Sequence, residues 1–218
     1  MNKKRVLLIL FVLVIIVVAG GFFWRDKIEN YLERKKMERM VALSKDYSIA
    51  EDSDGKFIIN EKDGLRVKIP TQWETEIGMD MYGLASEQYV TLYSKDFSYR
   101  PPKGCLVEIQ ISRLQKRQVE HYDEDLVMYP YEGAEEIKEV INSYKEAMPE
   151  EREGIKIISV DQNEALQETK ILGENIGGQV SIKIPTENKV YIFEGILFSE
   201  ECDKELEQFL ETVSINPD

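Results

Sequence analysis

The stretch GLRVKIPTQWETEIG, residues 64–78, alternates apolar and polar residues up to Ile69 and then reaches Pro70. A period of two is typical of a β-strand, and a proline cannot donate the next hydrogen bond of a strand ladder. The stretch therefore predicts a strand that ends at Pro70, followed by a turn that leads to Trp73. A tryptophan at this place predicts a core aromatic that seals the end of the strand, with a surface or pocket side chain that stacks on a ligand as the alternative.

The rest of the chain after residue 46 indicates an α+β domain. Segments with the period of a strand are residues 57–59, 89–93, 107–111, 155–160, 165–172, 180–184 and 190–198. The last of these is apolar on both faces, which favours a central strand covered on both sides. Two segments have apolar residues at steps of three and four and predict helices: residues 134–148, stopped by Pro149, and residues 199–215, with Ser199 as the N-cap. We expect a single antiparallel sheet flanked by helices.

The N-terminus predicts a membrane anchor. Residues 6–24 carry no charge, and nineteen residues in a helix span roughly the ~30 Å of a bilayer core. We expect residues 1–5 to form a cytoplasmic tail, residues 6–24 a transmembrane helix in contact with lipid, and residues 25–46 a juxtamembrane stalk helix. A cleavable signal peptide that ends near Ala19 is the alternative.

Charge bears on orientation and on partners. Three basic residues precede the apolar segment and six follow within twenty residues, so the positive-inside rule does not settle the orientation. We expect an N-terminus in the cytoplasm and residues 47–218 outside it, because large domains after a single signal-like helix translocate largely regardless of charge. Residues 46–218 carry a formal charge of −19, which argues against nucleic acid as a partner. The basic cluster at residues 34–36 predicts a solvated stalk face or contact with anionic lipid.

The sequence offers no clear catalytic, metal or cofactor site. His121 is the only histidine, and with Asp125 it supplies too few ligands for zinc. Cys105 has no neighbours that would activate it as a nucleophile beside that histidine. Asp54-Gly55 predicts a turn before a strand rather than a calcium loop, which would lack its first carboxylate. Gly177-Gly178 predicts a turn or bulge rather than a phosphate cradle.

The two cysteines leave two alternatives open. In an oxidising compartment, Cys105 at the head of a strand and Cys202 in the first turn of the last helix would form a disulfide that holds the helix on the sheet. Two separately buried thiols are the alternative.

Several segments resemble PsbP-like domains, the fold of the extrinsic photosystem II protein. The similar segments are the strand at residues 64–70 with Trp73, the strand entry at 160–165, the aromatic strand at 190–193 and the end of the final helix at 213–215. The resemblance implies an α/β/α sandwich over residues 47–218, with the tryptophan packed on the sheet edge. It also implies extracytoplasmic accessory or binding roles without catalysis.

These observations predict a membrane-anchored extracytoplasmic accessory or binding domain without catalytic activity. It would present an acidic module to a protein partner or a small ligand, and no cofactor is expected. One alternative is a structural or assembly component of an envelope complex. Another is a hydrolase that uses clustered carboxylates, such as Glu135 and Glu136 or residues 123–125.

Overall fold

The structure is a computed structural model that divides the chain into two compact units, Met1–Arg39 and Met40–Asp218. It describes residues 27–28, 31–80, 85–117, 119–122, 125–128, 131–146, 154–173 and 177–216. In the first unit, residues 27–28 and 31–39 are helical, and Lys35 lies 2.9 Å from the carboxylate of Glu38 one turn along.

The expected N-terminal transmembrane helix has no counterpart among the described residues. None of the helices in that part of the chain is long and apolar enough to cross a membrane. Residues 6–24, on which the expectation rested, lie outside the described residues.

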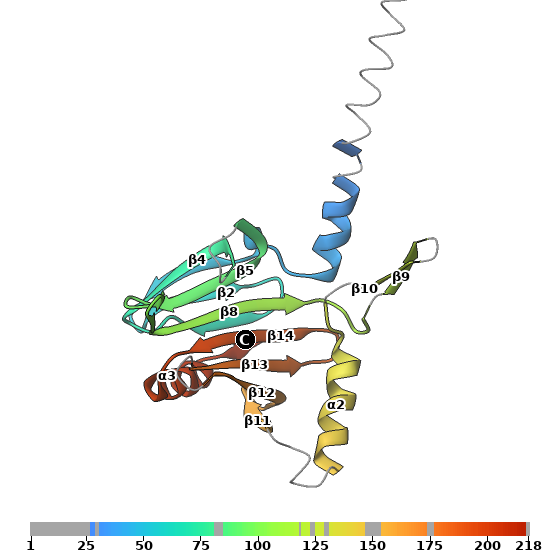
Figure 1. Ribbon diagram of the computed structural model, residues 1–218. Coiled ribbons are helices and arrows are strands. Elements are labelled where there is room, and N and C mark those ends of the chain that lie inside the picture. Colours follow the sequence, from blue (N-terminus) through green and yellow to red (C-terminus); the bar gives the residue numbers. More distant parts are fainter. Residues whose placement is uncertain are drawn as a thin grey trace, which may run out of the picture. The chain divides into compact units, whose positions relative to one another are not determined.

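The second unit consists mainly of antiparallel strands (Figure 1). The main sheet has the order β11 (Ile155–Val160), β12 (Asn163–Gly173), β13 (Gly177–Pro185), β14 (Val190–Leu197), β8 (Cys105–Ser112), β5 (Ala85–Ser94), β4 (Trp73–Met79). A smaller sheet has the order β1 (Ser48–Asp52), β2 (Gly55–Asn60), β3 (Leu65–Lys68), β15 (Ser214–Ile215). Two ribbons pair β6 (Ser98–Tyr99) with β7 (Pro102–Lys103) and β9 (Val119–Tyr122) with β10 (Asp125–Met128). The helical elements are η1 (Ser44–Asp46), α2 (Ala134–Glu146) and α3 (Glu200–Glu211).

The prediction of a single sheet flanked by helices is therefore wrong. The chain changes sheets at Pro70: the amide of Ile69 still donates to the carbonyl of Lys56 at 2.8 Å, but Pro70 has no amide hydrogen with which to continue the pairing. The chain turns, and Trp73 begins β4 at the far edge of the main sheet. The strand at residues 65–68 consequently belongs to the smaller sheet and not to the main one.

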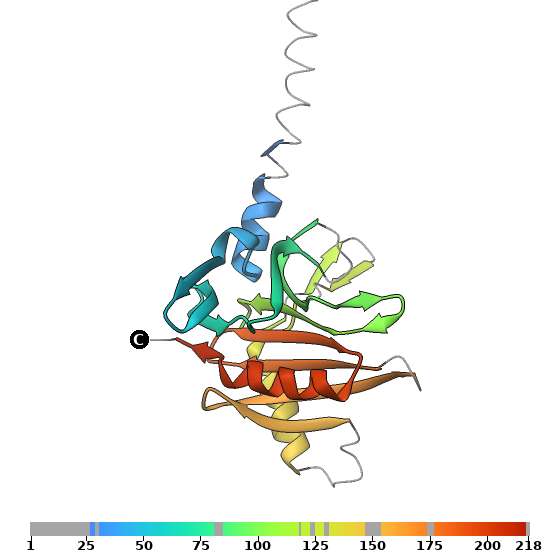
Figure 2. The ribbon, with the colours of Figure 1, turned by 90° about the vertical axis from the view of Figure 1, so that its left-hand side faces the viewer.

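The smaller sheet and α3 cover the same face of the main sheet (Figure 2). The core between them contains Val107, Ile109 and Ile111 of β8, which pack with Ile58 and Val67 of the smaller sheet. Further core residues are Tyr191 and Phe193 of β14 and Leu206 and Phe209 of α3. Helix α3 begins as predicted, because the Ser199 hydroxyl accepts a hydrogen bond from the amide of Cys202.

Helix α2 packs on the opposite face of the main sheet. Ala134, Ile137 and Ile141 on its apolar stripe contact a cluster formed by Leu166, Val190 and Ile192. The predicted helix is thus confirmed over residues 134–146, and its expected last turn lies outside the described residues. Alternate residues of each strand face α2 or the core, which determines where the polar side chains of β8 and β14 lie.

Candidate functional site

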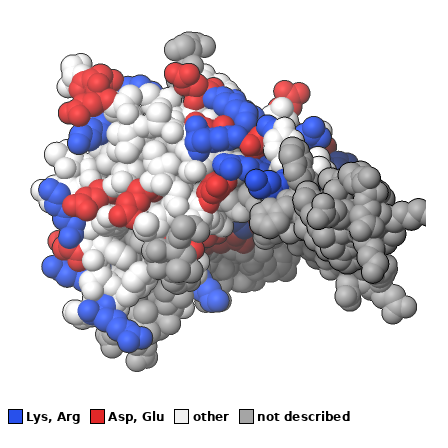
Figure 3. Space-filling model, turned by 90° about the horizontal axis from the view of Figure 1, so that it is seen from above, with Lys and Arg blue, Asp and Glu red and all other residues white. Residues whose placement is uncertain are grey.

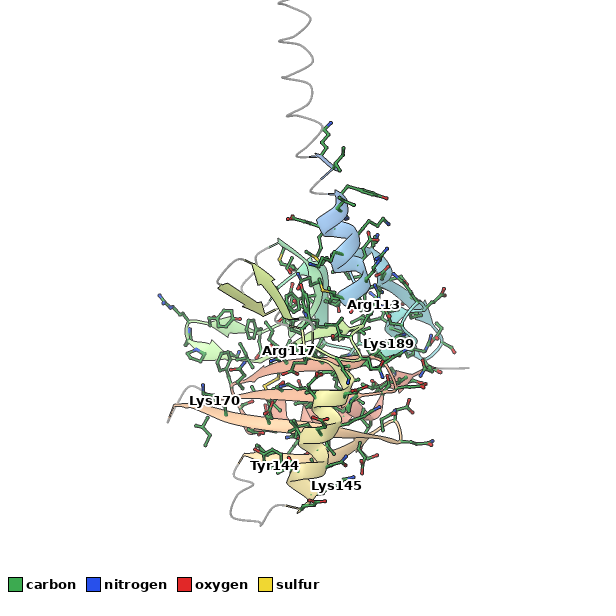
Figure 4. The ribbon with its side chains drawn as sticks, turned by 90° about the vertical axis from the view of Figure 1, so that its right-hand side faces the viewer. Arg113, Arg117, Tyr144, Lys145, Lys170 and Lys189 are labelled. Carbon is green, nitrogen blue, oxygen red and sulfur yellow. A yellow bond between two sulfur atoms is a disulfide. The ribbon has the colours of Figure 1, made fainter. Side chains whose placement is uncertain are left out.

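A row of polar residues crosses the main sheet on the face that α2 packs against. Its members are Cα partners of one another from strand to strand, so they lie side by side across five pairs of strands. From β4 to β12 this polar row consists of Glu76, Thr91, Glu108, Glu194, Ser181 and Glu168. Figure 4 views the molecule from this side, with α2 in front of the sheet.

Two glutamates stand directly opposite each other at the centre of the polar row. Glu108 of β8 is the Cα partner of Glu194 of β14, and directly opposed residues in antiparallel strands have Cβ atoms about 4.5–5.5 Å apart. Glu108 is only 4% exposed, and Glu194 is half-buried. Like charges in this arrangement destabilise a sheet.

The surroundings of Glu194 raise the pKa of its carboxyl. Burial raises the pKa of its carboxyl above the ordinary value, the positive charge of Lys183 lowers it, and the negative charges of Glu132 and Glu168 raise it further. The net direction is upward. The folded protein therefore favours the protonated form of Glu194 more than an unfolded chain does.

Lys183 holds the neighbouring carboxylates in place. Its ammonium lies 2.8 Å from Oε2 of Glu168 and 3.0 Å from Oε1 of Glu132. Burial would lower the pKa of Lys183, but hydrogen bonds to these two carboxylates and their charges raise it above its ordinary value. The folded structure therefore favours the positively charged form of Lys183. The guanidinium of Arg117 approaches the same oxygen of Glu132 at 3.8 Å.

Three buried polar atoms around the row lack a hydrogen-bond partner within the described part of the chain. They are Oγ of Ser181, Oε2 of Glu132 and Nε of Arg117. Leaving such groups unsatisfied costs about 1–3 kcal/mol each, and natural proteins contain few of them. The four carboxylates at positions 108, 132, 168 and 194 face two cations, so the cluster is formally negative. It has both charge and hydrogen-bonding capacity for a cationic group.

The sequence contains a signal for these glutamates. Each is the only charged residue in an otherwise apolar or neutral strand, CLVEIQIS for Glu108 and VYIFEGIL for Glu194. The apolar pattern of residues 190–198 correctly indicates a central strand, since β14 lies between β13 and β8. Glu194 interrupts the face that was expected to be apolar.

Trp73 lies at the corner between the two sheets. It is 7% exposed, its ring stacks on Phe209 with centroids 6.4 Å apart, and its Nε1 donates to the carboxylate of Glu205 at 3.0 Å. Its exposed edge lines three adjoining surface hollows of about 560, 510 and 390 Å³. The ring is thus packed as a core aromatic, and only its edge is available to a ligand.

The two cysteines are joined in a disulfide. Cys105 and Cys202 have Cα atoms 5.4 Å apart, both side chains are buried, and the bond connects the first residue of β8 to the first turn of α3.

The remaining sequence candidates are only partly described by the structure. His121 and Asp125 lie in the β9–β10 ribbon, whose side chains are outside the described set. Glu135 pairs with Lys116 at 2.9 Å, and Glu136 accepts a hydrogen bond from the main chain of Arg117. Within the described ranges, no group of three or more potential metal ligands is found.

Comparisons with known proteins give little further information. No protein-family model and no curated protein matches the chain. Among solved structures, a crystal structure of a protein from Bacteroides thetaiotaomicron VPI-5482 is similar with a TM-score of 0.40 and 11% identity. The match covers 71% of this chain and 46% of that one, so the chain spans less than half the length of that protein. A likeness of this size carries no argument about function, and the resemblance to PsbP-like domains stays a prediction.

Proposed function

We propose that the protein is a non-catalytic binding domain that recognises an ammonium or guanidinium group at the polar row. The opposed pair of Glu108 and Glu194 carries this proposal. A sheet that only needed to fold would place apolar residues at these positions, because burying two carboxylates side by side is costly. Natural proteins keep unfavourable arrangements of this kind mainly at functional sites.

A bound cation would offset the negative charges of Glu132 and Glu168, which raise the pKa of Glu194. A positive charge beside Glu108 and Glu194 favours the ionised form of Glu194, and the unpartnered oxygens of Ser181 and Glu132 can accept hydrogen bonds from an N–H donor. Binding should therefore strengthen as the pH rises through the pKa of Glu194. The formal charge of −19 on residues 46–218 would also attract a cationic ligand over a distance.

The same geometry argues against nucleophilic catalysis at the row. The hydroxyl of Ser181 has no hydrogen-bond partner in the described structure, so no base is placed to activate it. The carboxylates at positions 132 and 168 are held by Lys183. We therefore assign these groups to binding rather than to proton transfer.

The disulfide supports a location of the domain outside the reducing cytosol. Disulfides form and persist in oxidising compartments and are rare in cytosolic proteins. The bond between Cys105 and Cys202 is buried and joins two elements far apart in the chain, as structural disulfides do. An extracytoplasmic binding domain is the function that these observations support together.

Calorimetric titration of the full chain with spermidine and with a tetralysine peptide tests the proposal. We expect at least one of these probes to bind, and Glu194→Gln to weaken that binding on the order of tenfold, or about 1.4 kcal/mol. Glu207→Gln, on the exposed side of α3, removes the same charge away from the row and should leave affinity unchanged. Equal affinity in the wild type and Glu194→Gln, or no binding of either probe, would contradict the proposal.

A further inference from the structure

The edge of the main sheet offers a second surface, independent of the pair formed by Glu108 and Glu194. Among the described strands, β4 is the last of the main sheet and pairs with β5 alone. In the same described set, β1 is the last strand of the smaller sheet and pairs with β2 alone. A cleft of about 560 Å³ lies between the two sheets and is lined from both. We call it the β4 edge cleft.

The cleft opens on the main chain of β4. Three successive residues of the strand, Trp73, Glu74 and Thr75, line it. Successive side chains of a strand point to opposite faces, so a hollow that reaches all three lies along the strand's edge rather than on one face. Within the described structure, no hydrogen bond from outside the sheet reaches the main chain of Glu74 or Thr75. Such an edge is a template for a further strand.

On the core-facing side of β4, beside the β4 edge cleft, the hydroxyl of Thr75 has no hydrogen-bond partner among the described residues. Thr75 is the Cα partner of Leu92 and faces the core side, and its buried Oγ1 has no partner in the described structure. Across the cleft lies Ile49 of β1, whose side chain is 49% exposed. A small apolar or hydroxyl side chain entering here would cover Ile49 and bring a peptide group near the Thr75 hydroxyl.

The outer side of β4 is acidic. Glu74 and Glu76 alternate with Trp73, Thr75 and Ile77, so they lie on the α2 face of the sheet. In antiparallel pairing of two copies of β4 about a two-fold axis, the central registers would place these glutamates opposite Glu74 or Glu76 of the second copy. Like charges directly opposite each other are unfavourable, so the edge disfavours its own copy and favours a strand with basic residues there.

Charged groups on the walls of the cleft are not paired with each other within the described residues. Among those residues, no ion pair is formed by Lys56, Lys68 and Lys95 or by Glu51 and Asp54, all of which line the cleft. These walls are therefore close to neutral, whereas the strand's outer side and the domain as a whole are negative. Figure 3 views the molecule from above and shows small groups of acidic and basic side chains separated by uncharged surface.

From this arrangement we propose that β4 binds an extended, basic segment of a partner protein by strand addition. Alternate residues of that segment are lysine or arginine beside Glu74 and Glu76, and small or apolar residues toward Ile49 and Thr75. Main-chain hydrogen bonds to the free edge supply affinity, and the alternation supplies specificity.

The test uses the full chain and a fluorescently labelled heptapeptide of alternating lysine and valine, with anisotropy as the readout. A second peptide has the same sequence and charge, but the main-chain nitrogens on its pairing edge are methylated. We expect the first peptide to bind and the methylated one to bind at least about tenfold more weakly. Equal binding of the two peptides would overturn strand addition, because charge alone would then explain the association.

Two charge reversals locate the site. Glu74 is exposed, so Glu74→Lys should fold, and we expect it to weaken binding of the lysine peptide at least fivefold and to improve binding of a matched glutamate–valine peptide. Glu207→Lys changes the total charge equally at a position on α3 and should have a much smaller effect. If both variants weaken binding equally, or if the wild type binds neither peptide, the proposal is wrong. Binding that Glu194→Gln weakens but Glu74→Lys does not would place the lysine peptide at the polar row and contradict strand addition, which separates this test from that of the polar row.

Discussion

Glu194 and Asp63 show two ways in which a buried carboxylate is accommodated in this domain. Asp63 is almost fully buried, and Nε of Arg113 donates to its Oδ1 at 2.8 Å, with Lys189 3.3 Å away. Burial would raise the pKa of Asp63, but the hydrogen bonds and charge of Arg113, together with Lys189, hold it below its ordinary value. Its ionised form is well accommodated. Among the described residues, no cation forms a hydrogen bond with Glu194, and its pKa is shifted in the opposite direction.

Replacement of Glu194 by glutamine should therefore stabilise the protein at high pH. A glutamate whose pKa is raised by folding stabilises the folded state at a pH below its pKa in the unfolded chain, which is near 4.3. This contribution is lost as the pH rises through the pKa of the glutamate in the folded protein. We expect Glu194→Gln to increase the free energy of unfolding at pH 8 by about 0.5–1 kcal/mol and to change it little at pH 4. Urea unfolding at the two pH values measures this.

The matched control for that experiment is Glu187→Gln, in the exposed turn before β14. It should change the free energy of unfolding by less than about 0.5 kcal/mol at either pH, as surface substitutions usually do. A loss of stability in Glu194→Gln at pH 8 would show that the ionised carboxylate has a stabilising partner, contrary to the present account.

The disulfide links β8 to α3 across a sequence separation of 97 residues. Closing a loop of this length lowers the entropy of the unfolded chain and is worth at most about 4–5 kcal/mol. We expect the double variant Cys105→Ala, Cys202→Ala to lose about 2–4 kcal/mol in urea unfolding. A reducing agent should lower the wild-type midpoint and leave that of the double variant unchanged; an unaffected wild type under conditions that reduce the bond would contradict this role.

Local elements could be predicted from the sequence because their signals are local. The steps of three and four at residues 134–148 predict α2, and the Ser199 cap correctly predicts where α3 begins. The expected end of that helix is wrong, because α3 ends at Glu211 and Ser214–Ile215 form β15. Alternation predicts β8, and the apolar run at residues 190–198 predicts β14. β4 was missed although WETEIGM also alternates, because Pro70 and Trp73 were interpreted as a turn alone. The proline does end β3, and the next strand begins three residues later in another sheet.

Strand neighbours could not be predicted in the same way. Glu108 and Glu194 meet only because β14 pairs with β8, and the sequence between these strands contains α2 and three further strands of the main sheet. Nothing in the pattern of either strand specifies that partner or its register. The candidate site therefore depends on long-range pairing, and only the unusual position of each glutamate in its strand could be seen beforehand.

The second unit is an acidic domain with two distinct surfaces that we propose bind cationic partners. The polar row offers partly buried carboxylates on one face of the main sheet, and β4 offers a free edge flanked by Glu74 and Glu76. The formal charge of −19 on residues 46–218 would increase the rate at which a basic partner arrives, and added salt should reduce that rate.

We propose that the pair of Glu108 and Glu194 takes up a cation and that the bound cation lowers the pKa of Glu194. Carboxyl ¹³C NMR of the full chain, with Glu194 assigned by comparison with Glu194→Gln, follows its titration directly. Without ligand we predict a pKa above the ordinary glutamate value, and saturating spermidine or tetralysine should lower it. A pKa at or below the ordinary value, or one that neither probe changes, would contradict the account.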